Sequence, residues 1–212
     1  GTAFILCSVV GVLIGTISAF KQYTITDKII TFTVLTGISL PSFFLGMMMI
    51  LLFAVNLQWL PVSGMYAIYG GGDFLDLIHH LIMPAIALAL VATGVVARIT
   101  RNSVLEILRQ DYIRTARAKG VREGNVLFKH VLRIAIVTIL PILGLQAGFV
   151  LSGSVFIEIV FQWPGVGRML VDAILKRDIL LVQGGVMFVA ACYVLFNIAV
   201  DLLQRYLDPR IK

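Results

Sequence analysis

Long apolar segments alternate with shorter polar ones along this chain. Each apolar segment lacks charged residues and comes close to or exceeds the roughly 20 residues that a membrane-spanning helix needs. The second is longer than one span, and its membrane part is expected to begin near Thr33. The pattern predicts an all-α protein with five transmembrane helices in the segments 3–20, 29–59, 81–97, 134–157 and 179–200.

The basic residues indicate which way these helices cross the membrane. Of the 17 Lys and Arg residues, only Arg168, Lys176 and Arg177 lie in the connections 60–80 and 158–178. The others lie in the connections 21–28 and 98–133 and in the tail from Asp201. Because Lys and Arg accumulate on the cytoplasmic side, the N-terminus is predicted outside and the C-terminus inside.

Composition supports a membrane protein. Hydrophobic residues make up 59% of the chain and charged residues 13%, with a mean hydropathy of +1.00. A soluble domain has about 25% charged residues. The net charge of +6 is concentrated in the predicted cytoplasmic connections, so it does not indicate nucleic-acid binding.

No chemistry of its own is expected from the chain. It has no Gly-x-x-x-x-Gly-Lys-Ser/Thr phosphate loop and no paired catalytic groups at one depth. His79 and His80 are adjacent, but no spaced third ligand completes a metal site. Catalytic, cofactor and metal sites are therefore all predicted to be absent.

The longest charged segment, 102–133, is predicted to form two cytoplasmic helices. Ser103 and Glu106 have the spacing of a capping box at a helix start. Gly120 stands where a helix end favours a left-handed residue, and a second short helix is expected from Val121 to Arg133. Helical spacing of apolar residues predicts an amphipathic first helix through Val104, Leu108, Tyr112 and Ala116. Such helices can contact a partner protein or lie on anionic lipid, and the pattern does not decide between the two.

Residues 111–120, Asp-Tyr-Ile-Arg-Thr-Ala-Arg-Ala-Lys-Gly, resemble the EAA loop of ABC importer permeases, in its peptide/nickel form. The general motif is Glu-Ala-Ala, three residues and Gly. Ala116 and Gly120 match it, whereas Arg114 and Thr115 replace Glu and the first Ala. Six further stretches resemble the dipeptide/oligopeptide/nickel branch of this binding-protein-dependent family in the right order: 40–46, 59–64, 80–85, 98–101, 158–167 and 177–178.

The resemblance implies a single permease domain over 1–212, with a cytoplasmic coupling loop at 102–133. The family normally carries one more N-terminal span and a long external region, so an N-terminally truncated form is expected. The loop would dock on an ABC ATPase, with Gly120 supplying the turn between two coupling helices. The coupling residues implied are Asp111, Tyr112, Arg114, Thr115, Ala116, Arg117, Ala118, Lys119 and Gly120.

The implied protein is a multi-pass subunit of the bacterial inner membrane, surrounded by lipid. Its partners would be a second permease, identical or homologous, two ABC ATPases and an extracytoplasmic substrate-binding protein. ATP would be bound and hydrolysed by the ATPases. The cargo would be di- or oligopeptides, or nickel complexes. The alternative is a secondary transporter or channel, which favours charged residues within spans; none lies mid-span here.

Several polar and small residues within the spans have two interpretations. Gln146, Ser152, Ser154 and Asn197 either line a pathway or form interhelical hydrogen bonds. Glu158, close to a span end, should face protein or water because a lipid-facing charge is costly. The pairs Gly11/Gly15 and Gly144/Gly148 have the spacing that lets membrane helices pack closely.

Overall fold

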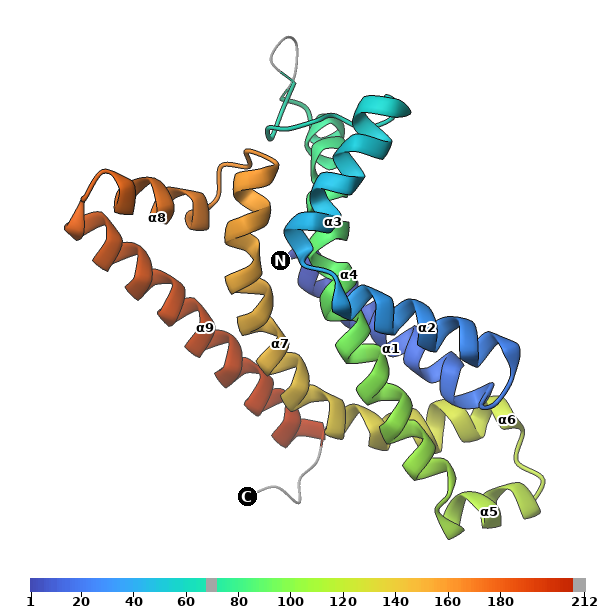
Figure 1. Ribbon diagram of the computed structural model, residues 1–212. Coiled ribbons are helices and arrows are strands. Elements are labelled where there is room, and N and C mark those ends of the chain that lie inside the picture. The colour runs from blue at the N-terminus through green and yellow to red at the C-terminus, as the bar shows by residue number, and fades with distance from the viewer. Residues whose placement is uncertain (68–71, 208–212) are drawn as a thin grey trace.

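The computed structural model describes residues 1–67 and 72–207, and all regular elements in this part of the chain are helices, without strands. The predicted all-α class is confirmed. The elements in order are α1 (Thr2–Phe20), α2 (Ile25–Ser39), α3 (Ser42–Met49), the π-helical η1 (Ile50–Asn56), α4 (Phe74–Leu108), α5 (Asp111–Ala118), α6 (Glu123–Asn125), the π-helical η2 (Val126–Leu132), α7 (Arg133–Val160), α8 (Val166–Leu175) and α9 (Ile179–Leu207) (Figure 1).

Four of the five predicted spans are single long helices. They correspond to α1, α4, the continuous run of α6, η2 and α7, and α9. The second span differs from the prediction because α2 and α3 meet at a bend of 103°. Pro41 has no backbone N–H, and it restricts the preceding residue to extended conformations. Leu40 accordingly has φ −96° and ψ 134°, and the helix stops there.

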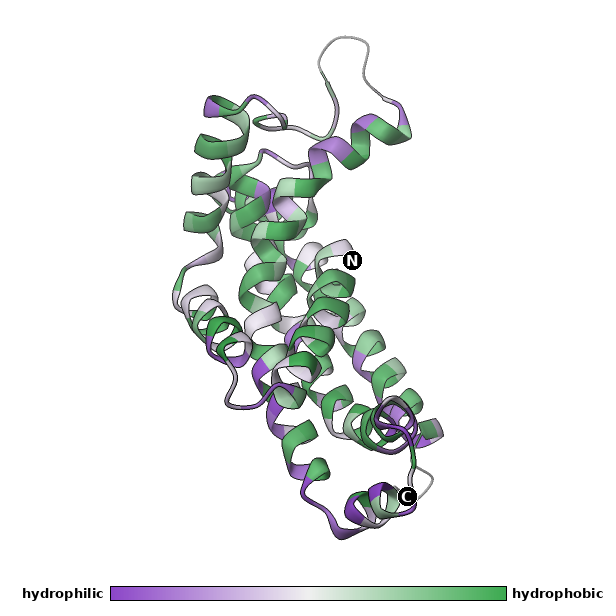
Figure 2. Ribbon diagram, turned by 90° about the vertical axis from the view of Figure 1, so that its right-hand side faces the viewer, coloured by the Kyte–Doolittle hydropathy of each residue, from purple (hydrophilic) through white to green (hydrophobic). Residues whose placement is uncertain are grey.

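The two sets of connections lie at opposite ends of the molecule. In Figure 1 the turn between α1 and α2, α5, and the end of α9 lie toward one end, whereas α8 and the segment after η1 lie toward the other. The ribbon between them is mostly hydrophobic, and hydrophilic segments gather at the ends (Figure 2). The two sets of connections are thus separated as the basic residues predicted; Arg210 and Lys212, which were part of that prediction, lie outside the described residues.

Small residues bring α1 and α2 close to α4. A Cβ on Gly11 would lie 2.7 Å from Cβ of Val96, and a Cβ on Gly15 would collide with the carbonyl oxygen of Ala97. A Cβ on Gly94 would lie 2.5 Å from Cγ1 of Ile38 in α2. The backbones can therefore approach closely at these positions because no side chain separates them.

The second half of the chain packs around α7. Cβ atoms on Gly144 and Gly148 would lie 2.9 Å from Asn197 Oδ1 and from Tyr193 Cε2 of α9. Both predicted glycine pairs thus serve close packing within this chain. In the most apolar 18-residue stretch of α9 only 6% of the residues are buried, whereas in that of α4 67% are buried. Helix α4 is therefore the central helix, and α9 lies at the periphery.

Candidate functional site

The cytoplasmic loop begins differently from the prediction. Ser103 and Glu106 are not a helix start, because α4 continues through them to Leu108. Val104 and Ile107 are buried against Ala19 of α1 and against the start of α7, and this packing extends α4 beyond the membrane segment. The chain breaks only at Arg109 and Gln110, after which α5 occupies residues Asp111–Ala118.

Helix α5 has a single buried side chain. Ile113 is fully buried, with 0% of its surface exposed. Its partners come from four parts of the chain, namely α1, α4, η2 and the first turns of α7. The buried cluster consists of Ala19, Val104, Ile107, Ile113, Val126, Val131, Ala135 and Ile139. The predicted second short helix, from Val121 to Arg133, is instead the beginning of a longer one, because α6 begins at Glu123 and continues through η2 into α7. Val126 and Val131 are buried in this cluster.

Gly120 ends α5 in the left-handed conformation that the sequence predicted. Its φ is +76°. The N–H of Gly120 donates to the carbonyl of Arg117 at 2.9 Å, and the N–H of Val121 donates to that of Ala116 at 3.2 Å. These two bonds form a Schellman motif, which satisfies carbonyl groups that the helix end would leave unpaired. A Cβ on Gly120 would meet nothing within 4 Å, so its backbone conformation, rather than space, favours glycine.

Most predicted coupling residues lie on the outside of α5 and its C-terminal turn. Only Ala116 among them is half-buried, and Arg117 is bound within the loop, where its guanidinium pairs with Glu123 at 2.8 Å. Partial burial raises the pKa of the Tyr112 phenol, which therefore stays neutral. The exposed members are Asp111, Tyr112, Arg114, Thr115, Arg117, Ala118, Lys119 and Gly120.

Two contacts of this loop were not predicted from the sequence. Ile113 was not among the predicted coupling residues, although it anchors the helix. Its signal was available, because it is the large aliphatic residue in a polar helix. The pairing of Arg117 with Glu123 had no comparable signal, since the two side chains meet across the Gly120 turn.

Residues 11–212 match the family described as the inner membrane component of binding-protein-dependent transport systems. The chain belongs to this family. The predicted family is therefore confirmed, and the protein is a permease component located in a bacterial inner membrane.

Similar proteins agree with this assignment. The permease is 41% identical to the di/tripeptide transport system permease DppB of Pseudomonas aeruginosa (strain UCBPP-PA14) over 228 residues, which cover 99% of this chain and 68% of that protein. It is 39% identical to the oligopeptide transport system permease AppB of Bacillus subtilis (strain 168), covering 98% of this chain and 66% of that protein.

Solved structures share the fold of this permease. Two inward-facing crystal forms of the MetNI methionine ABC transporter superpose with TM-scores of 0.74 and 0.77, at 16% and 17% identity. In both, 97% of this chain and 89% of the other are covered. Together with the family match, this fold does not favour the alternative of a secondary transporter or channel.

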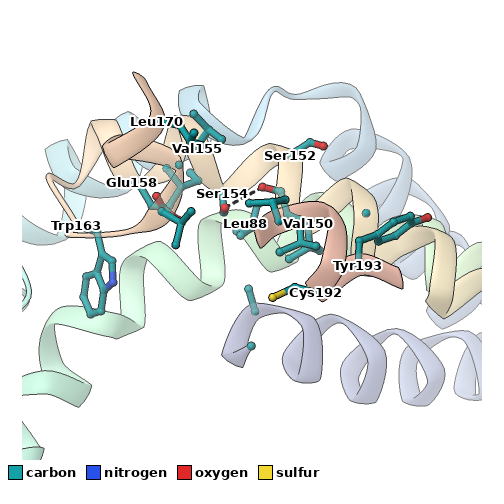
Figure 3. Close-up of a pocket in the computed structure, with 18 of the residues that line it drawn as sticks. Leu88, Val150, Ser152, Ser154, Val155, Glu158, Trp163, Leu170, Cys192 and Tyr193 are labelled. Atoms are coloured by element: carbon teal, nitrogen blue, oxygen red, sulfur yellow. Dashed lines mark hydrogen bonds between the residues drawn. The ribbon is translucent and has the colours of Figure 1, made fainter. Parts of the chain in front are cut away.

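The permease contains a cavity between its two halves. The cavity has a volume of about 870 Å³. It lies between α4 and the N-terminal start of α1 on one side and α7, α8 and α9 on the other. Ser152 and Ser154 of α7 line it, together with mainly apolar side chains (Figure 3). Among Gln146, Ser152, Ser154 and Asn197, only the two serines line this cavity. Asn197 instead donates a hydrogen bond to the Tyr193 carbonyl, and Gln146 is buried.

Glu158 lies at one end of this cavity and faces protein, as predicted. Its carboxylate accepts a hydrogen bond at 3.0 Å from the N–H of Arg168, in the first turn of α8. A Cβ on Gly165 would collide with that carboxylate, and one on Gly167 would lie 2.9 Å from Oε2. A negative charge is stabilised at a helix N-terminus, so Glu158 fastens α8 to the end of α7.

The two adjacent histidines hold the external segment after η1. His79 Nε2 lies 3.0 Å from the carbonyl oxygen of Trp59, and His80 Nδ1 lies 3.1 Å from the carboxylate of Asp76. Asp76 in turn accepts a hydrogen bond from the N–H of Ala67. Within residues 1–67 and 72–207, no three His, Cys, Asp or Glu side chains are placed to hold a metal ion.

Proposed function

We propose that this permease is the membrane subunit of an ATP-driven importer of di- or oligopeptides, and that α5 with the Gly120 turn docks on a cytoplasmic ABC ATPase. A second permease subunit completes the path across the membrane, and an extracytoplasmic binding protein delivers the cargo. ATP is bound by the ATPases, so the permease itself uses no cofactor. The coupling loop is the segment 102–133 within a single permease domain.

The observation that carries the docking role is the way α5 is attached. Ile113 is the one buried side chain of the helix, and the remaining surface of the helix is largely exposed. A rigid helix with a free outer surface can fit a groove on a partner and transmit a displacement to the helices on either side of it. The ordered Gly120 turn and the Arg117–Glu123 pair keep that outer surface in one shape.

The names of the relatives support the cargo. The matching proteins of Pseudomonas aeruginosa and Bacillus subtilis are named as di/tripeptide and oligopeptide permeases. Peptides are therefore proposed ahead of nickel complexes. Uptake of a labelled dipeptide by cells that carry or lack the gene for this permease tests the assignment; uptake that does not depend on the gene contradicts it.

The docking role is tested by replacing Gly120 with valine in the tagged permease, expressed in its native membrane. A β-branched residue in the left-handed conformation costs about 1–2 kcal/mol, so the turn should rearrange. We expect gentle solubilisation of the unchanged permease to recover an ABC ATPase, and Gly120→Val to recover about tenfold less. Mass spectrometry of the copurified proteins gives both quantities.

Gly124→Val is the matched control. Gly124 lies four residues further along, where a Cβ would meet nothing within 4 Å and φ is not positive, so ATPase recovery should be unchanged. Equal recovery and normal peptide uptake with Gly120→Val would contradict the docking role of the turn. A folded, inserted permease from which no ATPase is recovered would contradict the importer itself.

A further inference from the structure

A buried carboxylate joins three helices at the cytoplasmic end of the permease. Asp27, in the first turn of α2, is 5% exposed. Arg101 of α4 contacts both of its oxygens, with Nε donating to Oδ1 and Nη2 donating to Oδ2, each at 2.9 Å. Ser18 of α1 donates its hydroxyl to Oδ1 and accepts a second hydrogen bond from Arg101 Nε at 3.1 Å.

Each oxygen of the Asp27 carboxylate accepts two hydrogen bonds. Besides Arg101 and Ser18, the N–H of Tyr23 donates to Oδ2 at 3.1 Å. Tyr23 has a positive φ of 66°, which is unusual for a residue with a side chain, and this bond holds the turn between α1 and α2 in that shape. Asp27 lies ahead of the apolar segment, and its hydrogen bonds with Arg101 hold the pKa of the carboxyl well below its usual range.

Arg101 connects the ion pair to the helix that leads to α5. Arg101 lies on the continuous helix α4, which ends at Leu108, one short connection before α5. At the other end of α2, Ile38 packs against Gly94 of the same helix. Helix α2 is therefore fastened to α4 at both ends, by a bidentate ion pair and by a close backbone contact.

Beyond α2 the chain bends at Leu40 and enters a different environment. Gly46 of α3 packs against the ring of Phe161, where a Cβ would lie 3.0 Å from Cε2. The carbonyl of Phe161 also accepts a hydrogen bond at 2.8 Å from the N–H of Gly64. The outer part of the broken span thus contacts the end of α7 as well as α4, whereas its inner part is fastened to α4.

We propose that the Asp27–Arg101 ion pair is a positioning pair for transport, which makes α2 move with α4 when the ATPases displace α5. The displacement then reaches the bend at Leu40, where α2 and α3 can change their angle. Neither side chain contacts cargo or nucleotide. The inference rests on the proposed function, because it requires α5 to be the element on which the ATPases act.

The test compares transport with ATP hydrolysis in the complete complex, reconstituted in proteoliposomes with its binding protein and a dipeptide. In Asp27→Asn the side-chain oxygen still accepts one hydrogen bond, but the charge that holds Arg101 is gone. Because α5 is unchanged, we expect the ATPases to dock and hydrolyse ATP while transport per ATP falls about tenfold. Unchanged transport per ATP would overturn the proposal. Parallel loss of transport and hydrolysis would also overturn it, because that result indicates a purely structural role.

Arg101→Lys keeps the charge but loses the planar two-point contact with the carboxylate. It should assemble like the unchanged complex and show a smaller fall in transport per ATP. If the complex with Asp27→Asn fails to assemble, Arg101→Lys decides the proposal. A fall in its transport per ATP at unchanged ATP hydrolysis supports the proposal, and unchanged transport per ATP overturns it.

Thr24→Ala is the matched control at the same turn. The Thr24 hydroxyl accepts a hydrogen bond from the N–H of Asp27 at 3.4 Å, so this change weakens the start of α2 but leaves the ion pair in place. Transport per ATP should stay unchanged. If Gly120→Val lowers ATPase recovery and transport but Asp27→Asn leaves transport per ATP intact, only this inference fails. If Gly120→Val has no effect, the proposed docking fails, and the inference fails with it.

Discussion

The two halves of this permease are packed in different ways. Helices α1 and α2 lie against α4 through glycines, so that backbone meets backbone at Gly15 and side chain meets backbone at Gly94. Between α7 and α9 the glycines Gly144 and Gly148 face the ends of side chains, such as the Tyr193 ring against Gly148. Backbone cannot yield to an added atom, whereas the end of a side chain can rotate away. The first half is therefore the more rigid of the two.

The cavity lies where these halves meet. Its lining comes from α4 and α1 on one side and from α7, α8 and α9 on the other. The α4 wall is packed against α1 through a backbone contact at Gly15, whereas α7 and α9 meet through the ends of side chains at Gly144 and Gly148. Three replacements of glycine by alanine test this difference, since each adds the same single methyl group.

Gly15→Ala should have the largest effect. The new Cβ would collide with the carbonyl oxygen of Ala97 and lie 2.7 Å from Cβ of Thr100, so α1 must move away from α4. We expect the free energy of unfolding to fall by about 2–3 kcal/mol. Circular dichroism during titration of the purified permease with denaturing detergent measures it. A smaller loss of unfolding free energy than that of Gly148→Ala would contradict a rigid first half.

Gly148→Ala should have an intermediate effect. Its new Cβ would approach Cε2, Cζ and Oη of Tyr193 at 2.9–3.3 Å, and the ring can shift by a few tenths of an ångström. The expected loss of unfolding free energy is about 1 kcal/mol or less. The same titration measures it. A loss as large as that of Gly15→Ala would show that α7 and α9 are packed as tightly as α1 and α4.

Gly184→Ala should have the smallest effect, with the opposite sign. Gly184 lies within α9, and a Cβ there would meet nothing within 4 Å. Alanine restricts the unfolded chain more than glycine does, so the free energy of unfolding should rise by about 0.5 kcal/mol. Destabilisation in the same titration would contradict an open surface at this position of α9.

The sequence predicted the features that depend on local patterns. Uncharged apolar segments located α1, α4, α7 and α9, because a helix that crosses lipid must be apolar along its whole length. Gly120 was expected to adopt a left-handed conformation at a helix end, and it does so with φ +76°. Both features are determined by the residues immediately around them, so one segment at a time was enough to predict them.

Features that depend on distant contacts were missed or misjudged. The bend at Leu40 lies inside a continuous apolar segment, and hydropathy does not report the direction of a helix. Ser103 and Glu106 resembled a helix start, but buried contacts of Val104 carried α4 past them. Asp27 and Arg101 are 74 residues apart in sequence, and nothing near either residue indicates the other. Tertiary packing decided all three.

The bend at Leu40 determines where water must reach the broken span. A helix end leaves its last carbonyl groups without N–H partners from the next turn, and Pro41 has no N–H to offer. Lipid chains offer no hydrogen-bond donors to replace them. The hydroxyl of Ser39 donates to the carbonyl of Leu35, one turn earlier, and so does not cover the final ones. Hydration, or a polar group from a neighbouring chain, is therefore required at this point of an otherwise apolar segment.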